Sequence, residues 1–316
     1  MTSFDIRQCA KRIDPWIIKT PLVEIEALSE RTGKKVYLKL ESLQRTGAFK
    51  FRGAMNYMLA LDEEEAKRGV ITASSGNHGL GMSLGSKLKG VKCTVVMPVS
   101  APVTKQEQAK AYGATLVLHG ADYDEAQQHA QQLAERHGYI YVPSFNHRAI
   151  IEGQGTILNE ILGELPQVDM VVAPVGGGGL LAGLLVAKEQ AQATAEIVGV
   201  EPVGAASMQA SLAAGQATSL VTMDTIADGV AVRTPGNLNL EIISQFTPRM
   251  WQVTDIDILA AQKLLLRETK LIVETAGAVS VAGLLAAQLP AEIETVACVV
   301  SGANLDLSSL VGLIGV

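Results

Sequence analysis

The stretch DMVVAPVGGGGLLAGLLVAK, residues 169–188, contains an apolar run, four consecutive glycines and a second apolar run. The glycines are Gly176, Gly177, Gly178 and Gly179. The first run has the length and β-branched content of a buried strand, and the second has the length of a helix. Glycine loses more backbone entropy on folding than other residues, so four in a row need a reason. A glycine turn between a strand and a helix directs free N–H groups at one point, where the helix dipole favours an anion. The stretch therefore predicts a strand, an anion-binding turn and a covering helix.

The residues after this turn narrow the kind of anion. The lysine and the Ser or Thr of a P-loop are absent, and no acidic residue follows at the spacing of a dinucleotide fingerprint. A single phosphate monoester fits better. The alternative is a flexible turn without a ligand, but a tight strand–helix turn rarely needs four glycines.

The same alternation of short apolar runs and helix-like stretches continues along the chain. One helix is expected over 48–69 and another over 121–138, while 210–239 is the least periodic stretch and is expected to be a long surface excursion. Apolar strands joined by helices predict an α/β fold with mostly parallel sheet, whose ligands bind at the carboxyl ends of the strands. Strands are expected at 34–40, 70–74, 92–98, 114–120, 169–175, 196–202, 250–254 and 295–302.

Composition excludes several classes of protein. Of 316 residues, 48% are hydrophobic and 18% charged, which favours a large core over disorder. The net charge of −6 without a basic patch excludes nucleic acid as a partner, and no apolar run is long enough to span a membrane. Three widely spaced cysteines, Cys9, Cys93 and Cys298, and an N-terminus without an apolar signal segment predict a cytoplasmic protein with reduced thiols.

A second turn follows a predicted strand in TASSGNHGLG, residues 72–81. Ser74, Ser75, Asn77 and His78 crowd the start of a helix, where their donors join oriented backbone N–H groups. Such a turn is suited to a carboxylate. The alternative is an N-cap, but a cap needs only one of these residues.

A third turn lies in VVSGANLD, residues 299–306, where Ser301 ends an apolar strand. Asn304 and Asp306 could simply cap a helix, so this motif is weak alone. We expect all three turns to project to the same edge of one sheet, because the carboxyl ends of parallel strands share an edge.

A candidate for the reactive side chain is Lys50 in TGAFKFRGA, residues 46–54. Two of only five phenylalanines in the chain, Phe49 and Phe51, flank this lysine. A lysine stem often lies over apolar neighbours without any function. A desolvated lysine, however, has a lowered pKa and forms a Schiff base with an aldehyde. The aldehyde cofactor that carries a phosphate is pyridoxal 5'-phosphate (PLP). One of the flanking phenylalanines could then cover a face of the cofactor ring.

Together these motifs resemble the PLP-dependent serine/threonine dehydratase and serine racemase family, which has the tryptophan-synthase-β-like fold (fold type II). The resemblance extends over nearly the whole chain, in the order and spacing of the family. The motifs that carry it are TGAFKFRGA (46–54), SSGNHG (74–79), EGQGTI (152–157), GGGGLLAG (176–183), IADGVAVRTPGN (226–237), ETAGAV (274–279) and SGANLD (301–306).

The resemblance implies two domains, each a mostly parallel twisted sheet flanked by helices, with PLP in the cleft between them. The large domain would span 1–45 and 146–316, and the small domain 46–145. It also implies a homodimer.

The resemblance assigns roles to individual residues. Lys50 is the Schiff-base lysine and Phe49 packs on the cofactor ring, while Gly176 to Gly179 hold the phosphate. Asn77 contacts the phenolic oxygen of the cofactor, Ser301 faces the pyridine nitrogen and Glu274 lies near the ring. The substrate carboxylate is held by Ser74, Ser75, Asn77 and His78.

The activity implied is α,β-elimination of water from a β-hydroxy amino acid such as L-threonine or L-serine, giving a 2-oxo acid and ammonia. The alternatives are serine racemase and 3-hydroxyaspartate dehydratase or racemase. Ser75 matches the serine that acts on the second face of the substrate in eukaryotic serine racemases, so it is a second catalytic candidate. Ala126 stands where some racemases carry an arginine, and VAVRTPGN resembles the dehydratases, which favours elimination. A non-catalytic small-anion binding protein is the remote alternative, because a binder needs no lysine among aromatic residues.

A divalent cation, Mg²⁺ or Ca²⁺, is bound in the family by a Glu, a backbone carbonyl four residues on and an acidic residue six residues on. The corresponding residues here are Glu201, Ala205 and Ser207. The third carboxylate is therefore missing, which weakens the expectation of a cation.

Overall fold

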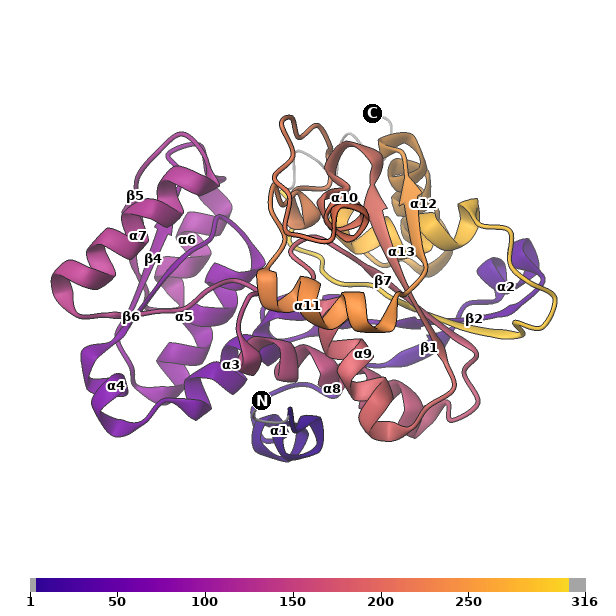
Figure 1. The fold of residues 1–316 in the computed structure, drawn as a ribbon, viewed down its shortest axis with the longest axis horizontal. Helices are drawn as coiled ribbons and strands as arrows, with labels where there is room; N and C mark the ends of the chain where they lie inside the picture. The colour runs from indigo at the N-terminus through magenta and orange to yellow at the C-terminus, as the bar shows by residue number, and fades with distance from the viewer. Residues whose placement is uncertain (1–3, 307–316) are drawn as a thin grey trace.

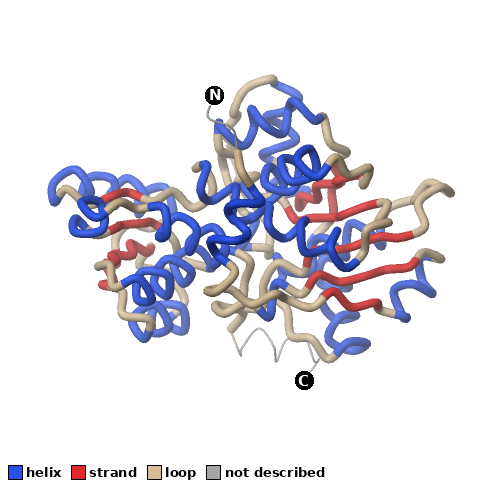
Figure 2. Tube along the Cα trace, turned by 90° about the horizontal axis from the view of Figure 1, so that it is seen from below, coloured by secondary structure: helices blue, strands red, loops and turns tan. Residues whose placement is uncertain are grey.

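The computed structural model describes residues 4–306, which form two sheets. The large sheet has six strands in the order β1-β2-β10-β7-β8-β9, and the small sheet has four in the order β5-β4-β3-β6. Figures 1 and 2 show the two sheets at opposite ends of the molecule with helices between them. The large sheet contains β1 (Leu22–Glu24), β2 (Lys35–Lys39), β7 (Met170–Pro174), β8 (Glu196–Pro202), β9 (Met250–Val253) and β10 (Thr295–Val299). The small sheet contains β3 (Val70–Ala73), β4 (Cys93–Met97), β5 (Thr115–Leu118) and β6 (Ile140–Tyr141).

Every strand pairing is parallel except that of β1 with β2, which is antiparallel at the edge of the large sheet. The mostly parallel α/β fold predicted from the sequence is confirmed. All eight predicted strands are present. The sequence patterns do not predict β1 and β6, because three and two residues are too few to show a period.

Helices cover the strands on both sides. They are α1 (Ile6–Ile13), α2 (Glu26–Thr32), α3 (Lys50–Ala60), α4 (Glu63–Arg68), α5 (Asn77–Lys89), α6 (Val103–Ala111), α7 (Tyr123–His137), α8 (Arg148–Glu164), α9 (Gly179–Ala191), α10 (Ser207–Ala214), α11 (Asn237–Phe246), α12 (Asp255–Thr269) and α13 (Thr275–Ala286). Short 3₁₀ turns are η1 (Glu41–Leu43), η2 (Val203–Ala205) and η3 (Asp228–Val230). Residues 215–236, between α10 and α11, are irregular apart from η3, as expected. Both ends of the stretch 210–239 are instead helical, and Ala227 and Val230 within it are buried in the core rather than at the surface.

The central strands of the large sheet are apolar throughout because alternate residues enter different core clusters. Val172 packs with Val198 in a cluster that includes side chains of α12 and α13. Its neighbour Val171 packs with Ile197 in a second cluster that includes side chains of α8 and α9. Burial on both faces explains the continuous apolar runs that predict these strands.

The single helix expected over 48–69 is wrong, because the chain forms α3 and α4 with a break between them. Asp62 accepts a hydrogen bond from the backbone N–H of Glu65 at 2.8 Å, and the Glu65 side chain accepts one from the N–H of Asp62 at 3.1 Å. This reciprocal capping box begins a new helix at Glu63. The signal in the sequence is an Asp followed three residues later by a Glu.

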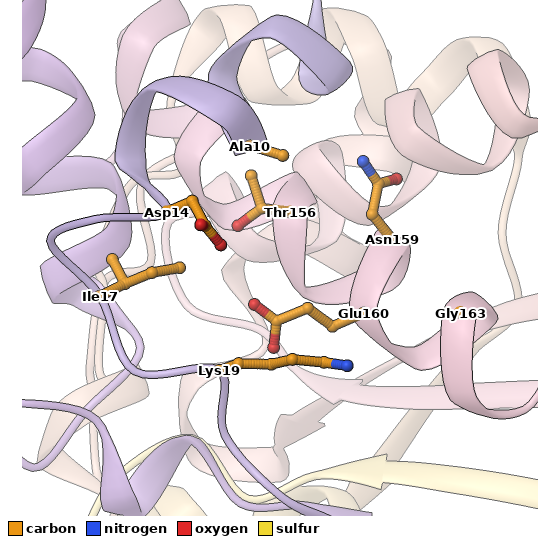
Figure 3. A pocket seen from close by; sticks show the side chains of 8 residues that line it. All are labelled: Ala10, Asp14, Ile17, Lys19, Thr156, Asn159, Glu160 and Gly163. Atoms are coloured by element: carbon orange, nitrogen blue, oxygen red, sulfur yellow. The ribbon is translucent and has the colours of Figure 1, made fainter.

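Buried ion pairs connect α3 with η1 and α8. The guanidinium of Arg52 donates to both carboxylate oxygens of Glu41 at 2.8 Å and to Glu160 at 2.6 and 2.9 Å. Lys39 donates to the same Glu160 at 2.6 Å. Arg52 and Glu41 are inaccessible to water, whereas Glu160 and Thr156 reach the wall of a cavity of about 230 Å³ (Figure 3). These contacts fix the start of α3 on the body of the large sheet.

Within residues 4–306, no helix combines the length and apolar composition needed to cross a membrane.

Candidate active site

The glycine turn lies between β7 and α9, as predicted. Gly178 has a φ of +89°, a left-handed conformation that favours glycine. A Cβ at Gly177 would lie 2.5 Å from the ring of Phe145, so a larger residue cannot be accommodated without a shift. Among residues 4–306, no backbone or side-chain acceptor takes a hydrogen bond from the N–H groups of Gly176, Gly177 or Gly178. Free N–H groups beside a helix N-terminus form an anion-binding cradle.

Lys50 is the first residue of α3 and is half-buried. Its Nζ donates to the carbonyl oxygen of Ser144 at 3.1 Å. The same atom lies 5.4 Å from the ring centroid of Phe49 and 5.8 Å from that of Phe145. Burial lowers the pKa of Lys50 to about 8, although the carboxylate of Glu274 opposes the shift. A lysine in this setting is available as a nucleophile and a base near neutral pH.

The rings that lie within 6 Å of the Lys50 ammonium group are those of Phe49 and Phe145, whereas the side chain of Phe51 is fully buried. The second aromatic ring near Lys50 is that of Phe145, which is not among the site residues predicted from the sequence. It stands 95 positions away, so only the folded chain brings it to the site.

The turn at Ser74–His78 follows β3. Ser74 Oγ accepts a hydrogen bond from the N–H of Gly76 at 3.2 Å, and Asn77 begins α5. The half-buried Ser75 hydroxyl has no hydrogen-bond partner among residues 4–306.

His78 is 2% exposed, and neither of its ring nitrogens has a hydrogen-bond partner within the described chain. Burial lowers the pKa of the imidazole to about 3, and the charge of the Lys50 ammonium lowers it further. His78 is therefore neutral and can offer a hydrogen bond but no charge. Buried ring nitrogens without partners fit a site that receives a polar ligand.

Hydrogen bonds join this turn to the large sheet. The amide of Asn77 donates to Glu274 at 2.5 Å, and Asn304 donates to Asn77 at 2.8 Å. Glu274 immediately precedes α13 and is buried, which raises its pKa to about 7; the charge of Lys105 and the hydrogen bond from Asn77 oppose this rise. Ser301, just beyond β10, is buried and donates to the carbonyl oxygen of Ala276 at 3.2 Å.

The expectation that all three turns lie at one edge of one sheet is wrong. The glycine turn and the turn at Ser301 follow β7 and β10 of the large sheet, but the turn at Ser74–His78 follows β3 of the small sheet. The sequence predicts each of these strands correctly, but it does not indicate which sheet each strand joins. The site is instead assembled where the carboxyl ends of strands from two sheets approach each other.

The expected cation ligands have a different arrangement. The two carboxylate oxygens of Glu201 accept hydrogen bonds from the N–H groups of Met208 at 2.8 Å and Gln209 at 2.9 Å, which caps α10. Ala205 lies in η2, and the buried Ser207 hydroxyl has no partner among residues 4–306. No group of three or more His, Cys, Asp or Glu residues is placed to hold a metal within the described range. One carboxylate that already caps a helix fits a divalent cation poorly.

The site and fold define a class of protein: an α/β enzyme in which a glycine turn suited to an anion and a desolvated lysine both lie beside the ring of Phe145, an arrangement that suits PLP. Residues 13–302 match the family described as pyridoxal-phosphate dependent enzyme. The chain belongs to this family, and PLP is its cofactor.

Relatives within the family are similar over almost the whole chain. The chain is 40% identical over 310 residues to an L-threonine ammonia-lyase of Thermotoga maritima, covering 98% of this chain and 77% of the relative. It is 38% identical over 314 residues to the L-threonine dehydratase catabolic TdcB of Staphylococcus aureus, covering 98% and 91%.

Solved structures show the same architecture. Maize serine racemase has a TM-score of 0.93 at 33% identity, covering 98% of this chain and 95% of that one. The processed form of threonine deaminase isoform 2 from Solanum lycopersicum has a TM-score of 0.91 at 39% identity, covering 100% and 96%. Structural likeness therefore extends to both a racemase and a deaminase.

Proposed function

We propose that this chain is a PLP-dependent ammonia-lyase that removes water from L-threonine or L-serine and yields 2-oxobutanoate or pyruvate with ammonia. The observation that carries the proposal is that Lys50, with its lowered pKa, occurs together with a glycine turn whose N–H groups have no acceptor among residues 4–306. The relatives named as threonine ammonia-lyase and dehydratase support the choice of substrate.

The residues that hold the cofactor are proposed from this geometry. Lys50 would bind its aldehyde carbon, Phe49 would pack on its ring, and the N–H groups of Gly176 to Gly179 would bind its phosphate. Asn77 would contact the phenolic oxygen, Ser301 would face the pyridine nitrogen, and Glu274 would lie near the ring. When bound, PLP withdraws electrons from the α-carbon of an amino acid and so makes its proton acidic.

Chain residues would then carry the substrate and its protons. Ser74, Ser75, Asn77 and His78 would hold the substrate carboxylate, and a neutral His78 would donate a hydrogen bond. Lys50 is the base that we propose for the α-proton, because a pKa of about 8 leaves part of its population unprotonated near pH 7. Release of the β-hydroxyl as water then produces the enamine of the 2-oxo acid, which is hydrolysed to the 2-oxo acid and ammonia.

A racemase is the second candidate function. It is favoured by the half-buried Ser75 hydroxyl, which has no partner in the described chain, and by the likeness to maize serine racemase. Racemisation needs an acid on the face opposite Lys50, and Ser75 is the residue proposed for that face. 3-Hydroxyaspartate is the third candidate substrate, for either the elimination or the racemisation.

A steady-state comparison of L-threonine, L-serine and L-threo-3-hydroxyaspartate tests the proposal when both the 2-oxo acid and the D-amino acid are measured. We expect 2-oxo acid to form faster than D-amino acid. Faster formation of D-serine than pyruvate from L-serine would overturn elimination as the main activity. If the protein converts none of the three substrates, the proposal that it is a lyase for β-hydroxy amino acids is wrong.

We further propose a cytoplasmic homodimer whose small domain spans 46–145 and whose large domain spans 1–45 and 146–316. The separate sheets support the division, since the small sheet lies within 70–141. Light scattering of the purified protein tests the dimer, and a mass equal to one chain would contradict it.

A further inference from the structure

Lys105 is a second lysine near the proposed site that none of the motifs includes. It lies in the first turn of α6, and its side chain is half-buried. Its Nζ is 4.0 Å from the point where a Cβ at Gly76 would lie, in the middle of the Ser74–His78 turn. The ammonium group therefore lies directly against the turn proposed to hold the substrate carboxylate.

The start of α6 is held in this place by a contact with the segment that follows β10 of the large sheet. Thr104, the neighbour of Lys105, donates a hydrogen bond to the carboxylate of Asp306. The charge of Lys105 also acts on Glu274 and is the largest influence that opposes the rise of the Glu274 pKa. These neighbours show that Lys105 faces the space between the two sheets.

Within the described part of the chain, no carboxylate pairs with Lys105. It makes no hydrogen bond or ion pair with any residue in 4–306. Glu274 lies more than hydrogen-bond distance away and already accepts a hydrogen bond from Asn77. A partly desolvated ammonium group without a partner is costly, and a bound anion would offset that cost. The opposite face of the same helix shows the usual arrangement, because Lys110 is exposed to water.

We propose that Lys105 is a substrate-binding residue whose ammonium group pairs with the α-carboxylate of the amino acid held at the Ser74–His78 turn. The inference rests on the proposed function, because it takes an amino acid as the ligand. The turn supplies neutral donors, since His78 is uncharged, so Lys105 supplies the positive charge at this subsite. It thereby makes the site selective for amino acids over amines and amides of similar shape.

The size of the effect follows from the exposure of the pair. An ion pair that remains partly open to water contributes about a fivefold change in affinity. We therefore expect Lys105→Gln to raise the KM for L-threonine about fivefold with little change in kcat, and Lys105→Arg to keep most of the affinity. Lys110→Gln on the same helix is the matched control and should behave like the wild type.

A pair of inhibitors isolates the charge interaction. L-Alanine has the carboxylate but no leaving group, and L-alaninamide has a neutral amide in place of the carboxylate. Their dissociation constants are read from the change in absorbance of the bound cofactor, which needs no turnover. Lys105→Gln should weaken L-alanine about fivefold and leave L-alaninamide unchanged. Equal weakening of both ligands, or of neither, would overturn the proposal.

The outcomes separate this inference from the proposed function. A wild type that dehydrates neither L-threonine nor L-serine but shows the carboxylate-specific loss in Lys105→Gln would refute the lyase and support Lys105. Normal dehydration with no such loss would refute Lys105 alone. Lys105→Met, which keeps the apolar stem, repeats the test if the glutamine variant does not fold.

Discussion

Replacing Arg52 by methionine should be among the most destabilising changes in this chain. The guanidinium makes four hydrogen bonds to Glu41 and Glu160, at 2.8, 2.8, 2.6 and 2.9 Å. Methionine matches the length of the apolar stem but leaves the Glu41 carboxylate buried without its cation. Arg52 lies two positions after Lys50 in α3, so the same change loosens the start of the helix that presents the proposed catalytic lysine.

The magnitude follows from the burial of the partners. The side chains of Arg52 and Glu41 are both 0% exposed. Removing one member of such a pair costs about 3–5 kcal/mol, because the remaining charge cannot reach water. Lys39 still pairs with Glu160, which lies on the cavity wall in Figure 3 and is 14% exposed. We therefore assign the loss mainly to Glu41 and expect about 4 kcal/mol.

The assay is urea unfolding followed by circular dichroism. Glu164→Gln is the control, since Glu164 lies at the end of the same α8 and pairs with Lys19 at 3.3 Å with exposed fractions of 35% and 64%. That surface pair should contribute less than about 1 kcal/mol. If Arg52→Met fails to fold, Glu41→Gln tests the same pair with a neutral side chain of equal shape. A loss in these variants no larger than that of the control would refute the reasoning.

Three further predictions concern the cofactor, the proposed second catalytic residue and a buried carboxyl group. Gly177→Val should weaken PLP binding about tenfold or more, because a Cβ at this position meets the ring of Phe145. Gly163→Ala is the control and should leave PLP binding unchanged, because there is open space around Gly163. If a cofactor titration gives equal affinities for the two variants, the four glycines form a turn that does not bind the phosphate. Ser75→Ala should abolish the conversion of L-serine to D-serine while keeping much of the formation of pyruvate. If Ser75→Ala loses both activities as completely as Lys50→Ala does, Ser75 and Lys50 do not have separate roles on the two faces of the substrate. Burial raises the pKa of Glu201 from 4.5 to about 7, so the folded state binds a proton that the unfolded state lacks between these values. The free energy of unfolding should rise as the pH falls from 7 to 5, and Glu201→Gln should flatten this dependence; an unchanged slope would show that Glu201 is not the group responsible.

Local patterns in the sequence predict the elements well where a single run of residues decides the structure. The strand, glycine turn and helix at 169–188 is such a case, because burial on both faces makes β7 continuously apolar. The break at Asp62 could also have been predicted, since the capping box needs only two residues three positions apart.

Contacts between distant segments could not be predicted in this way. Neither Phe145 nor Lys105 is among the residues predicted for the site, and each reaches it only because parallel strands and their helices are packed together. The sequence also does not reveal that β3 belongs to a different sheet from β7 and β10, since strand pairing is a property of the whole chain. Arg52 lies within a recognised motif, yet its partners Glu41 and Glu160 are known only from the folded protein.

The most direct test of the central claim is to locate the lysine that binds the cofactor. The purified protein loaded with PLP is reduced with borohydride, digested and mapped by mass spectrometry. The geometry at Phe49, Phe145 and the glycine cradle predicts covalent attachment at Lys50. Attachment at another lysine such as Lys105, or no attachment at all, would contradict the account.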